Sequence, residues 1–311
     1  MYLVSICVPT YKRVEYLLQS LDILELASRV SEVEIVICDN DPSPYNETKD
    51  LIKRYNNLNI VYMKNSENIG IDRNMIRTIE IASGKYCFWL GDDDIISNES
   101  VDKLLSTVEN TEFDLILANT SWISEDLLDK GENWSNSAEY TYNDLDLFLS
   151  QHIFNMPFGS IIVRREYIKL VDISKYFGTS HAYSGYILEY LNLIQFKRSV
   201  NVLHSKGIKV YLRNCEKSWS ESAFKIHYEE IPKWFFLIPL KDNIRNKLLD
   251  DYLSSIFSVS SIVSNGVSIK TLSLLNLSYK LKLSYKLKIV AVRLVKKIMD
   301  LFRRFINMIH V

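Results

Sequence analysis

Short apolar runs alternate with longer segments of helical periodicity along the first 120 residues of this chain. Each run has the length of a strand, and each intervening segment repeats its apolar residues every three or four positions. The predicted strands are residues 4–8, 33–38, 60–63, 86–90 and 114–117, and the predicted helices are residues 13–28, 47–55, 71–82 and 98–108. Apolar strands separated by helices predict an α/β fold, with a mostly parallel sheet flanked by helices on both faces.

The composition is that of a folded protein with few breaks. The chain has 311 residues, of which 47% are apolar, and holds only 9 glycines and 6 prolines. We therefore expect one large core, with or without a smaller appended unit, and no flexible linker. The four cysteines lie far apart, and Cys7, Cys38 and Cys87 fall in predicted strands, which favours reduced core thiols in a cytosolic protein. Because the first strand follows the amino terminus directly, no signal peptide is expected.

Polar loops follow the predicted strands, at the sheet edge where ligands bind in open α/β folds. These loops are residues 9–13, 39–41, 65–70 and 91–94. The last of them holds three consecutive aspartates, Asp92, Asp93 and Asp94, directly after an apolar strand. Adjacent carboxylates repel one another unless a cation lies among them, and Mg²⁺ or Mn²⁺ prefers such oxygen ligands. The alternative is that an aspartate caps a helix beginning at Ile95, but one carboxylate would suffice for that.

Four segments of the chain, taken together, resemble glycosyltransferase family 2, whose members have the GT-A fold. They are Pro9-Thr10-Tyr11-Lys12-Arg13, Asp39, Asn68-Ile69-Gly70-Ile71-Asp72-Arg73-Asn74 and the aspartate run, in this order and spacing. The resemblance covers about the first 120 residues well and the next 90 loosely. It implies a Rossmann-like, nucleotide-sugar-binding half over residues 1–120, an acceptor-binding half over 121–215 and a helical C-terminal extension over 216–311.

The resemblance also implies roles for individual residues. The donor would contact Pro9, Thr10, Tyr11, Arg13, Asp39, Asn68, Gly70, Arg73, Asp92 and Asp93, and the metal would be held by Asp92, Asp93 and Asp94. Two of these have structural alternatives, since Asp39 can form an Asx turn and Arg73 can be a solvated helix residue. Gly91 stands where the family usually has an aspartate, so the division of roles among the three aspartates is open, with Asp92 and Asp94 favoured.

The catalytic base of an inverting transfer must reach the acceptor hydroxyl, and the sequence leaves its identity open. Many family members carry an adjacent acidic pair in their second half, but none occurs here between residues 156 and 195. His181, just before a predicted helix over residues 183–193, stands near that place and has a suitable intrinsic pKa. The alternative is a histidine with a structural role. The other candidates for the base are Glu189, Asp172 and Glu166.

The C-terminal segment is strongly basic and repeats a short motif. Ten Lys or Arg and a single acid, Asp300, lie from residue 270 onward, so the rest of the chain is acidic. The hexad Leu-Ser-Tyr-Lys-Leu-Lys occurs twice over residues 277–288, and helical periodicity follows. A basic amphipathic helix of this kind lies on an anionic membrane surface or packs on the protein's own core. Charges interrupt every apolar run, so we do not expect it to span a membrane.

These features combine in one functional hypothesis. The chain would be a peripheral enzyme on the cytoplasmic face of the cell membrane, using Mn²⁺ or Mg²⁺. It would move a hexosyl or deoxyhexosyl group from a nucleoside-diphosphate-sugar, with inversion, to a glycan on undecaprenyl diphosphate during bacterial O-antigen, lipopolysaccharide or capsule synthesis. No nucleic acid partner is expected. Two alternatives stay open: a nucleotidyltransferase, which usually has a glycine-rich loop after its first strand, and a non-enzymatic membrane-binding module.

Overall fold

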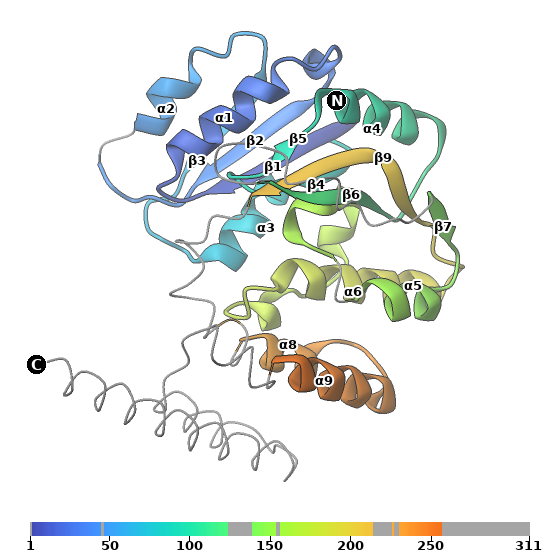
Figure 1. Ribbon diagram of the computed structural model, residues 1–311. Helices are drawn as coiled ribbons and strands as arrows, with labels where there is room; N and C mark the ends of the chain where they lie inside the picture. Colours follow the sequence, from blue (N-terminus) through green and yellow to red (C-terminus); the bar gives the residue numbers. More distant parts are fainter. Residues whose placement is uncertain are drawn as a thin grey trace, which may run out of the picture. The chain divides into compact units, whose positions relative to one another are not determined.

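A computed structural model describes residues 2–44, 47–123, 139–153, 156–213, 226 and 230–256 of the chain. The chain divides into two compact units, Met1–Cys215 and Glu216–Val311, and each is described by itself. Figure 1 labels the helices and strands as they are named below. The predicted basic tail, residues 270–311, lies outside the described residues, as does most of the segment between β9 and α8.

The first unit is built on one curved sheet (Figure 1). Its described strands are β1 (Val4–Thr10), β2 (Glu34–Asp39), β3 (Asn59–Lys64), β4 (Tyr86–Trp89), β5 (Ile95–Ile96), β6 (Leu115–Ile123), β7 (Tyr140–Tyr142), β8 (Ile161–Arg164) and β9 (Val202–Arg213). They follow the order β3-β2-β1-β4-β8-β6-β9-β5, and β7 pairs with β9. β1 is parallel to β2 and β4, and β2 is parallel to β3. The predicted parallel sheet is therefore confirmed for the first four strands.

Beyond β4 the sheet is mixed, yet its long strands still point the same way. β8 is antiparallel to both β4 and β6, so β4 and β6 run in the same direction. β9 is parallel to β6, and the short strands β5 and β7 run against it. The strands β1, β2, β3, β4, β6 and β9 consequently end at one edge of the sheet. Ligands of open α/β folds bind at that edge.

Helices cover both faces of this sheet. One face carries α1 (Val14–Leu24), α2 (Glu47–Ile52) and α4 (Asn98–Asn110), and the other carries α3 (Ile71–Ile81), α5 (Leu145–His152) and α6 (Ala182–Gln195) (Figure 1). α1 buries one stripe of its surface, with Leu17, Leu21 and Leu24 at helical spacing, whereas α6 is buried on most of its sides. The predicted α/β fold with helices on both sides of the sheet is confirmed.

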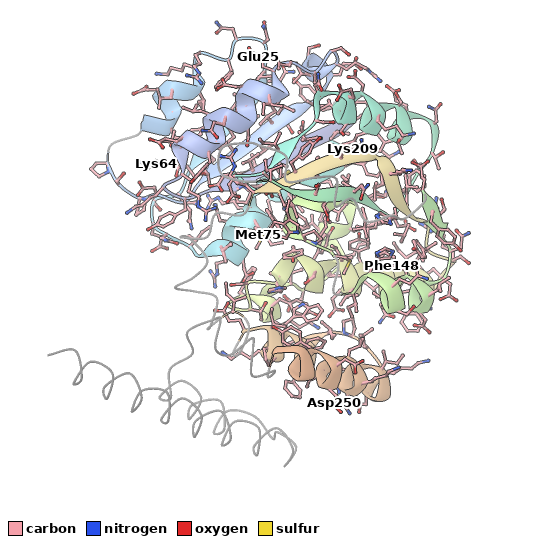
Figure 2. The ribbon with its side chains drawn as sticks, in the orientation of Figure 1. Glu25, Lys64, Met75, Phe148, Lys209 and Asp250 are labelled. Atoms are coloured by element: carbon pink, nitrogen blue, oxygen red, sulfur yellow. The ribbon has the colours of Figure 1, made fainter. Side chains whose placement is uncertain are left out.

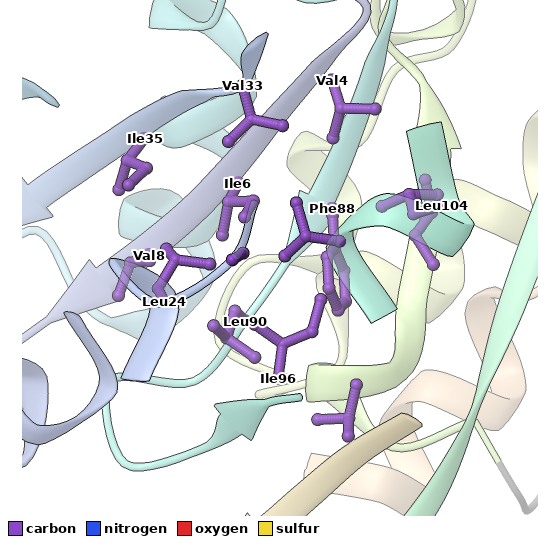
Figure 3. Packing of buried hydrophobic residues seen from close by; sticks show 14 of the residues in the cluster. Val4, Ile6, Val8, Leu24, Val33, Ile35, Phe88, Leu90, Ile96 and Leu104 are labelled. Atoms are coloured by element: carbon purple, nitrogen blue, oxygen red, sulfur yellow. The ribbon is translucent and has the colours of Figure 1, made fainter. Parts of the chain in front are cut away.

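The main apolar core lies between the sheet and the first of these helical layers. Alternate residues of β1, such as Val4 and Ile6, point to the same face, as a period of two requires. They pack in one cluster with Phe88 of β4, Leu24 of α1 and Leu104 of α4 (Figure 3). All five side chains are at most 2% exposed. Burial of each such side chain stabilises the fold by roughly 1.5–3 kcal/mol. This packing holds β1 and β4 in place against the helices, and with them the loops that follow the two strands.

The opposite face of the sheet is rich in aromatic side chains. The ring of Trp89 meets those of Phe158, Tyr183 and Tyr186, with centroids 5.9, 6.4 and 6.0 Å away. Its indole N–H donates to the carbonyl of Met75, a residue of α3 labelled in Figure 2, at 3.1 Å. This cluster joins β4 to α3 and α6. It therefore sets the position of the first turn of α6, where a candidate catalytic residue lies.

The predicted core thiols are confirmed where the structure describes them. Cys7, Cys38 and Cys87 are buried and free. Burial raises the pKa of Cys38 to about 12, so this thiol stays protonated and unreactive at neutral pH. Cys215 lies outside the described residues.

The described part of the second unit consists of α8 (Ile231–Leu237) and α9 (Asp242–Ile256). Pro232 lies in the first turn of α8, where a proline lacks no needed donor. Phe235 of α8 packs its ring on Tyr252 of α9, with centroids 5.5 Å apart. None of the helices in the described residues has the length and hydropathy needed to cross a bilayer.

Candidate functional site

The carboxyl ends of β1 and β4 bring together four polar side chains of the predicted site. Thr10, the last residue of β1, donates its hydroxyl to Oδ2 of Asp92 at 2.8 Å. Arg13, which precedes α1, donates from Nη1 to Oδ1 of Asp92 at 3.2 Å and to Oδ2 of Asp93 at 2.9 Å. The guanidinium of Arg13 thus already lies between two of the three carboxylates. These contacts join the loop after β1 to the loop after β4.

Asp94 has hydrogen-bond partners of its own. Its Oδ1 accepts the backbone N–H of Arg213, at the end of β9, at 3.3 Å. Its Oδ2 lies against two glycines: a Cβ built on Gly91 or Gly159 would lie 2.5 or 2.2 Å from that oxygen. Asp92 and Asp93 thus share a contact with Arg13, whereas Asp94 contacts the end of β9.

The aspartates do not cap the following helix, so the helix-cap alternative is wrong. Ile95 and Ile96 form β5, which pairs with Tyr211 and Val210 of β9. α4 begins only at Asn98, with Ser97 in the N-cap position. A short strand thus separates the carboxylates from the helix.

The three aspartates are buried close to one another. Each is at most 8% exposed. Burial first, and then the charge of Asp93, raises the pKa of Asp92 to about 6, although Arg13 and Thr10 oppose the shift. Burial and the charges of Asp93 and Asp92 raise the pKa of Asp94 to about 8. A further cation at this edge of the sheet would relieve that repulsion.

The donor set suits a divalent ion that is completed by a substrate. Within the described ranges, no three His, Cys, Asp or Glu side chains are grouped so that they could hold a metal ion by themselves. Magnesium-type ions commonly take one or two carboxylates and fill their remaining positions with water and substrate phosphates. Asp92 and Asp93, whose carboxylates converge on one cation, fit this smaller donor set.

An asparagine network links the ends of β2 and β3 to the start of α3. Asn40 donates from Nδ2 to Oδ1 of Asn68 at 2.8 Å. Asn65 donates from Nδ2 to Oδ1 of Asn40 at 3.0 Å and to Oδ1 of Asn74 at 2.8 Å. The N–H of Ile69 also donates to Asn40. Of these residues only Asn68 was predicted to bind the donor, and the network fixes its position.

Asp39 and Gly70 lie beside this network. Asp39 is buried and accepts the N–H of Asp41 at 3.0 Å through Oδ1 and the hydroxyl of Tyr62 at 2.8 Å through Oδ2. The first contact is the Asx turn that we gave as its structural alternative. Gly70 has a φ of 82° and precedes α3, a conformation that favours glycine.

The remaining predicted donor residues lie at the rim of this edge. Pro9 belongs to β1, opposite Cys38 of β2. Tyr11 is 42% exposed, and Nζ of Lys12 lies 5.4 Å from its ring centroid. Arg73, on the exposed side of α3, places its guanidinium 5.0 Å from the ring of Phe177. That contact reaches into the second half of the unit.

The four candidates for the base have different surroundings, and one of them, Glu166, forms an ion pair with Arg164. His181 holds the N-cap position of α6, and its Nδ1 lies 3.2 Å from the carbonyl oxygen of Thr179. Glu189 accepts the hydroxyl of Tyr176 at 2.8 Å and forms an ion pair with Lys175. Asp172 is exposed and accepts the N–H and hydroxyl of Ser174, which lower its pKa. The structure thus engages Glu189 and Asp172 in local contacts.

Asp72 connects the donor side to the loop that carries His181, and the sequence analysis gave it no role. Its buried carboxylate accepts the backbone N–H groups of four residues, at 2.8–3.1 Å. These residues are Gly178, Thr179, Ser180 and Ala182. The available signal was spacing, because Asp72 lies at helical intervals from Met75, Ile76 and Ile79, on the buried stripe of α3.

Comparison with known proteins identifies a family and a relative of this chain. Residues 5–171 match the model of the family described as Glycosyl transferase family 2. The abequosyltransferase RfbV of Salmonella typhimurium is 29% identical over 207 residues, which are 61% of this chain and 61% of that protein. The chain thus spans less than two thirds of that relative's length.

Two solved structures share the fold. The crystal structure of S. aureus TarS 1-349 in complex with UDP-GlcNAc matches with a TM-score of 0.63 and 18% identity, over 88% of this chain and 80% of that one. The mannosyltransferase PcManGT from Pyrobaculum calidifontis, in complex with GDP-Man and Mn²⁺, matches with a TM-score of 0.55 and 10% identity, over 96% and 87%.

Proposed function

Since the chain belongs to glycosyltransferase family 2 and has the GT-A fold, we propose that it transfers a sugar, with inversion, from a nucleoside-diphosphate-sugar to a hydroxyl of a bacterial surface glycan. The observation that carries this proposal is the group formed by Thr10, Arg13, Asp92 and Asp93 at the carboxyl ends of β1 and β4. Two buried carboxylates at this edge, of which Asp92 has a raised pKa, suit a metal ion that binds a diphosphate.

The donor would lie across the ends of β1, β2 and β3. Asp39 presents a buried carboxylate to the ribose, and Asn68 and Gly70 border the base pocket together with Thr10 and Tyr11. The asparagine network keeps this side preorganised. The TarS and PcManGT structures hold UDP-GlcNAc and GDP-Man, which supports a nucleotide-sugar donor for this chain.

We infer that Mn²⁺ or Mg²⁺ is held by Asp92 and Asp93, with Asp94 as the further candidate ligand. The PcManGT complex contains Mn²⁺. When bound, the ion would neutralise charge on the leaving diphosphate. Arg13 lies between the same carboxylates and would keep them ordered before the donor arrives.

His181 is the proposed base, because it lies on the loop that Asp72 ties to the donor side. The acceptor oxygen forms a bond with the anomeric carbon and gives its proton to the imidazole of His181. The bond from that carbon to the diphosphate breaks, and its electron pair stays on the phosphate oxygen. Glu189, which accepts the hydroxyl of Tyr176, and Asp172, which accepts that of Ser174, are the alternative bases.

The acceptor and location are inferred from the sequence. A glycan on undecaprenyl diphosphate would hold the acceptor at the cytoplasmic face of the membrane, and the basic tail over residues 270–311 would attach the enzyme there. The similarity to an abequosyltransferase supports a hexosyl or deoxyhexosyl transfer of this kind.

A panel of UDP-, GDP-, CDP- and dTDP-sugars, each with and without Mn²⁺, tests the proposal. One donor should raise the melting temperature by roughly 5–10 °C at saturation when Mn²⁺ is present, and EDTA should abolish the rise. Turnover should release a nucleoside diphosphate, whereas a nucleotidyltransferase would release pyrophosphate and a binding module nothing.

Variants test the site itself. Asp92→Asn should lower turnover by roughly 100-fold or more, as loss of a group that stabilises transition-state charge does. Asp146→Asn, an exposed aspartate of α5, is the control and should behave like the native chain. Metal-dependent donor binding that survives Asp92→Asn and Asp93→Asn together would contradict the assignment.

A further inference from the structure

Arg213 lies at the ligand edge of the sheet, and its side chain has no role in the site described so far. It is the last residue of β9, and β9 runs in the same direction as β1 and β4. Its backbone N–H donates to Asp94, which places the start of its side chain directly beside the aspartate run. The topology thus brings a cationic residue, remote in sequence, to the place where the donor diphosphate is proposed to lie.

The guanidinium of Arg213 is buried and only partly satisfied. The residue is 5% exposed. Nη1 donates to Oε1 of Gln19 at 2.6 Å, and the guanidinium carbon lies 4.8 Å from the ring centroid of Tyr16. Nε and Nη2 are both buried without a hydrogen-bond partner in the described part of the chain. Two of its three nitrogens therefore point to no acceptor.

A buried cation with unused donors is costly to a fold. A charge removed from water needs an opposite charge and a full set of hydrogen bonds, and leaving one unpaired costs several kcal/mol. Packing on Tyr16 alone would be served better by an apolar side chain. The position of Arg213 is therefore better explained by an anion that binds there than by stability.

The chemistry of the two free donors identifies the kind of anion. The N–H groups of a guanidinium are fixed in one plane and match two oxygens of a phosphate or a carboxylate. The carboxylate of Asp94 accepts the backbone N–H of Arg213, and no hydrogen bond joins it to the guanidinium within the described residues. A phosphate group brought by a ligand fits the unused donors.

We propose that Arg213 binds the diphosphate of the donor through Nε and Nη2, a role that rests on the proposed glycosyl transfer. In this role Arg213 contacts the leaving group, which is the diphosphate of the donor. When the bond to the anomeric carbon breaks, that phosphate gains one negative charge, and the cation stabilises it without giving up a proton. Arg13 and the metal ion proposed to lie on Asp92 and Asp93 would contact the diphosphate from the β1 side, and Arg213 contacts it from the β9 side.

Isothermal titration of the full-length protein with nucleotides tests this role. UDP, GDP, CDP and dTDP, with Mn²⁺, identify the nucleotide that the native chain binds, and the matching monophosphate is then compared. Arg213→Gln should weaken binding of the diphosphate by about 10-fold or more, as loss of charged hydrogen bonds does, and binding of the monophosphate by less than about 3-fold. Arg213→Lys keeps the charge without the planar donors and should fall between.

Arg164→Gln is the matched control. Arg164 also has a buried Nε without a partner within the described residues, but it pairs with Glu112 and Glu166. It lies opposite Tyr86, the first residue of β4, and hence at the other edge of the sheet. Its replacement removes one positive charge and should leave both nucleotide affinities unchanged.

The outcomes separate the two proposals. If the native chain binds a nucleoside diphosphate and Arg213→Gln binds it equally well, the role of Arg213 is wrong while the proposed function stands. An equal loss of diphosphate and monophosphate affinity would show a general structural effect and also overturn the role. If the native chain binds none of the four diphosphates, the proposed function fails, and the role of Arg213 fails with it. Should Arg213→Gln not fold, the comparison of Arg213→Lys with the native chain decides in the same way.

Discussion

At the scale of single residues, Gly91 is the position where the aspartate run departs from the usual pattern of its family. Family members usually carry an aspartate there. In this chain the carboxylate of Asp94 occupies the space that a side chain at residue 91 would need, and Gly159 closes the other side. The N–H of Arg213 also holds that carboxylate. The missing aspartate and the orientation of Asp94 therefore have one steric cause.

Gly91→Ala is predicted to displace the Asp94 carboxylate. An added methyl group in a closely packed, buried site costs about 1–3 kcal/mol, or roughly 2–10 °C in melting temperature for a unit of this size. Gly207→Ala is the control, because the three atoms nearest to its Cβ would belong to the flexible side chain of Lys103, which can move away. Calorimetry that gave both variants the melting temperature of the native chain would contradict this account of Gly91.

At the scale of the elements, the link between α3 and α6 is the contact that organises the acceptor side. Asp72, in the first turn of α3, accepts four backbone N–H groups around the start of α6. Burial raises its pKa, and these four hydrogen bonds oppose that rise. One carboxylate thus replaces the hydrogen bonds that the backbone of residues 178–182 does not find locally.

Asp72→Asn should loosen this link. An asparagine keeps one acceptor oxygen but turns an NH₂ group towards backbone donors, so part of the set is lost at a cost of about 1.5–3 kcal/mol. We expect a lower melting temperature and a larger fall in kcat than in donor affinity, since the donor side is held separately. Asp144→Asn is the control, because Asp144 caps α5 through one N–H that an asparagine also accepts. Equal losses of kcat in both variants would contradict a positioning role for Asp72.

The parts of the site that the sequence predicted are those made by local contacts. The ends of β1, β2 and β4 follow from apolar runs of strand length, so Thr10, Asp39 and the aspartate run could be placed at one edge. The partners of Asp72 lie 106–110 positions away, and no spacing rule reaches that far. β5 was not predicted, and only the helix-cap alternative assigned its residues, to the start of a helix, because these two residues pair as a strand with the distant β9. Arg213 was missed for the same reason.

At the scale of the whole molecule, a buried histidine pair makes the folded state sensitive to acid. The rings of His152 and His204 lie 4.9 Å apart, joining α5 to β9. Burial, together with the charge of His204, lowers the pKa of His152 to about 4. In the unfolded chain the value is about 6.5. Between these values only the unfolded chain binds the proton, so the free energy of unfolding rises with pH up to about 6.5 and is unaffected by this group above it.

The melting temperature should therefore fall as the pH is lowered from about 6.5 to 4.5, and His152→Gln should reduce the slope. The glutamine amide can keep the hydrogen bond to the hydroxyl of Tyr142, which is 2.8 Å long, but it cannot take up a proton. Melting curves recorded at half-unit intervals of pH check this. Parallel slopes for the native chain and the variant would show that His152 does not contribute to acid sensitivity.

The uneven charge of the chain leads to a prediction about membrane binding. Ten basic residues lie from residue 270 onward, whereas the rest of the chain is acidic. Each basic residue near an anionic leaflet contributes about 1 kcal/mol, so replacing Lys280, Lys282, Lys286 and Lys288 with glutamine should lower affinity for vesicles containing phosphatidylglycerol by at least roughly 100-fold. The control replaces four exposed lysines outside the tail, which removes the same charge and should have little effect. They are Lys53, Lys169, Lys197 and Lys206.

Binding to the vesicles should also weaken with salt, because the charges of the tail are screened within about 8 Å at physiological ionic strength. Equal co-sedimentation of the two variants would mean that attraction depends on net charge and not on the tail.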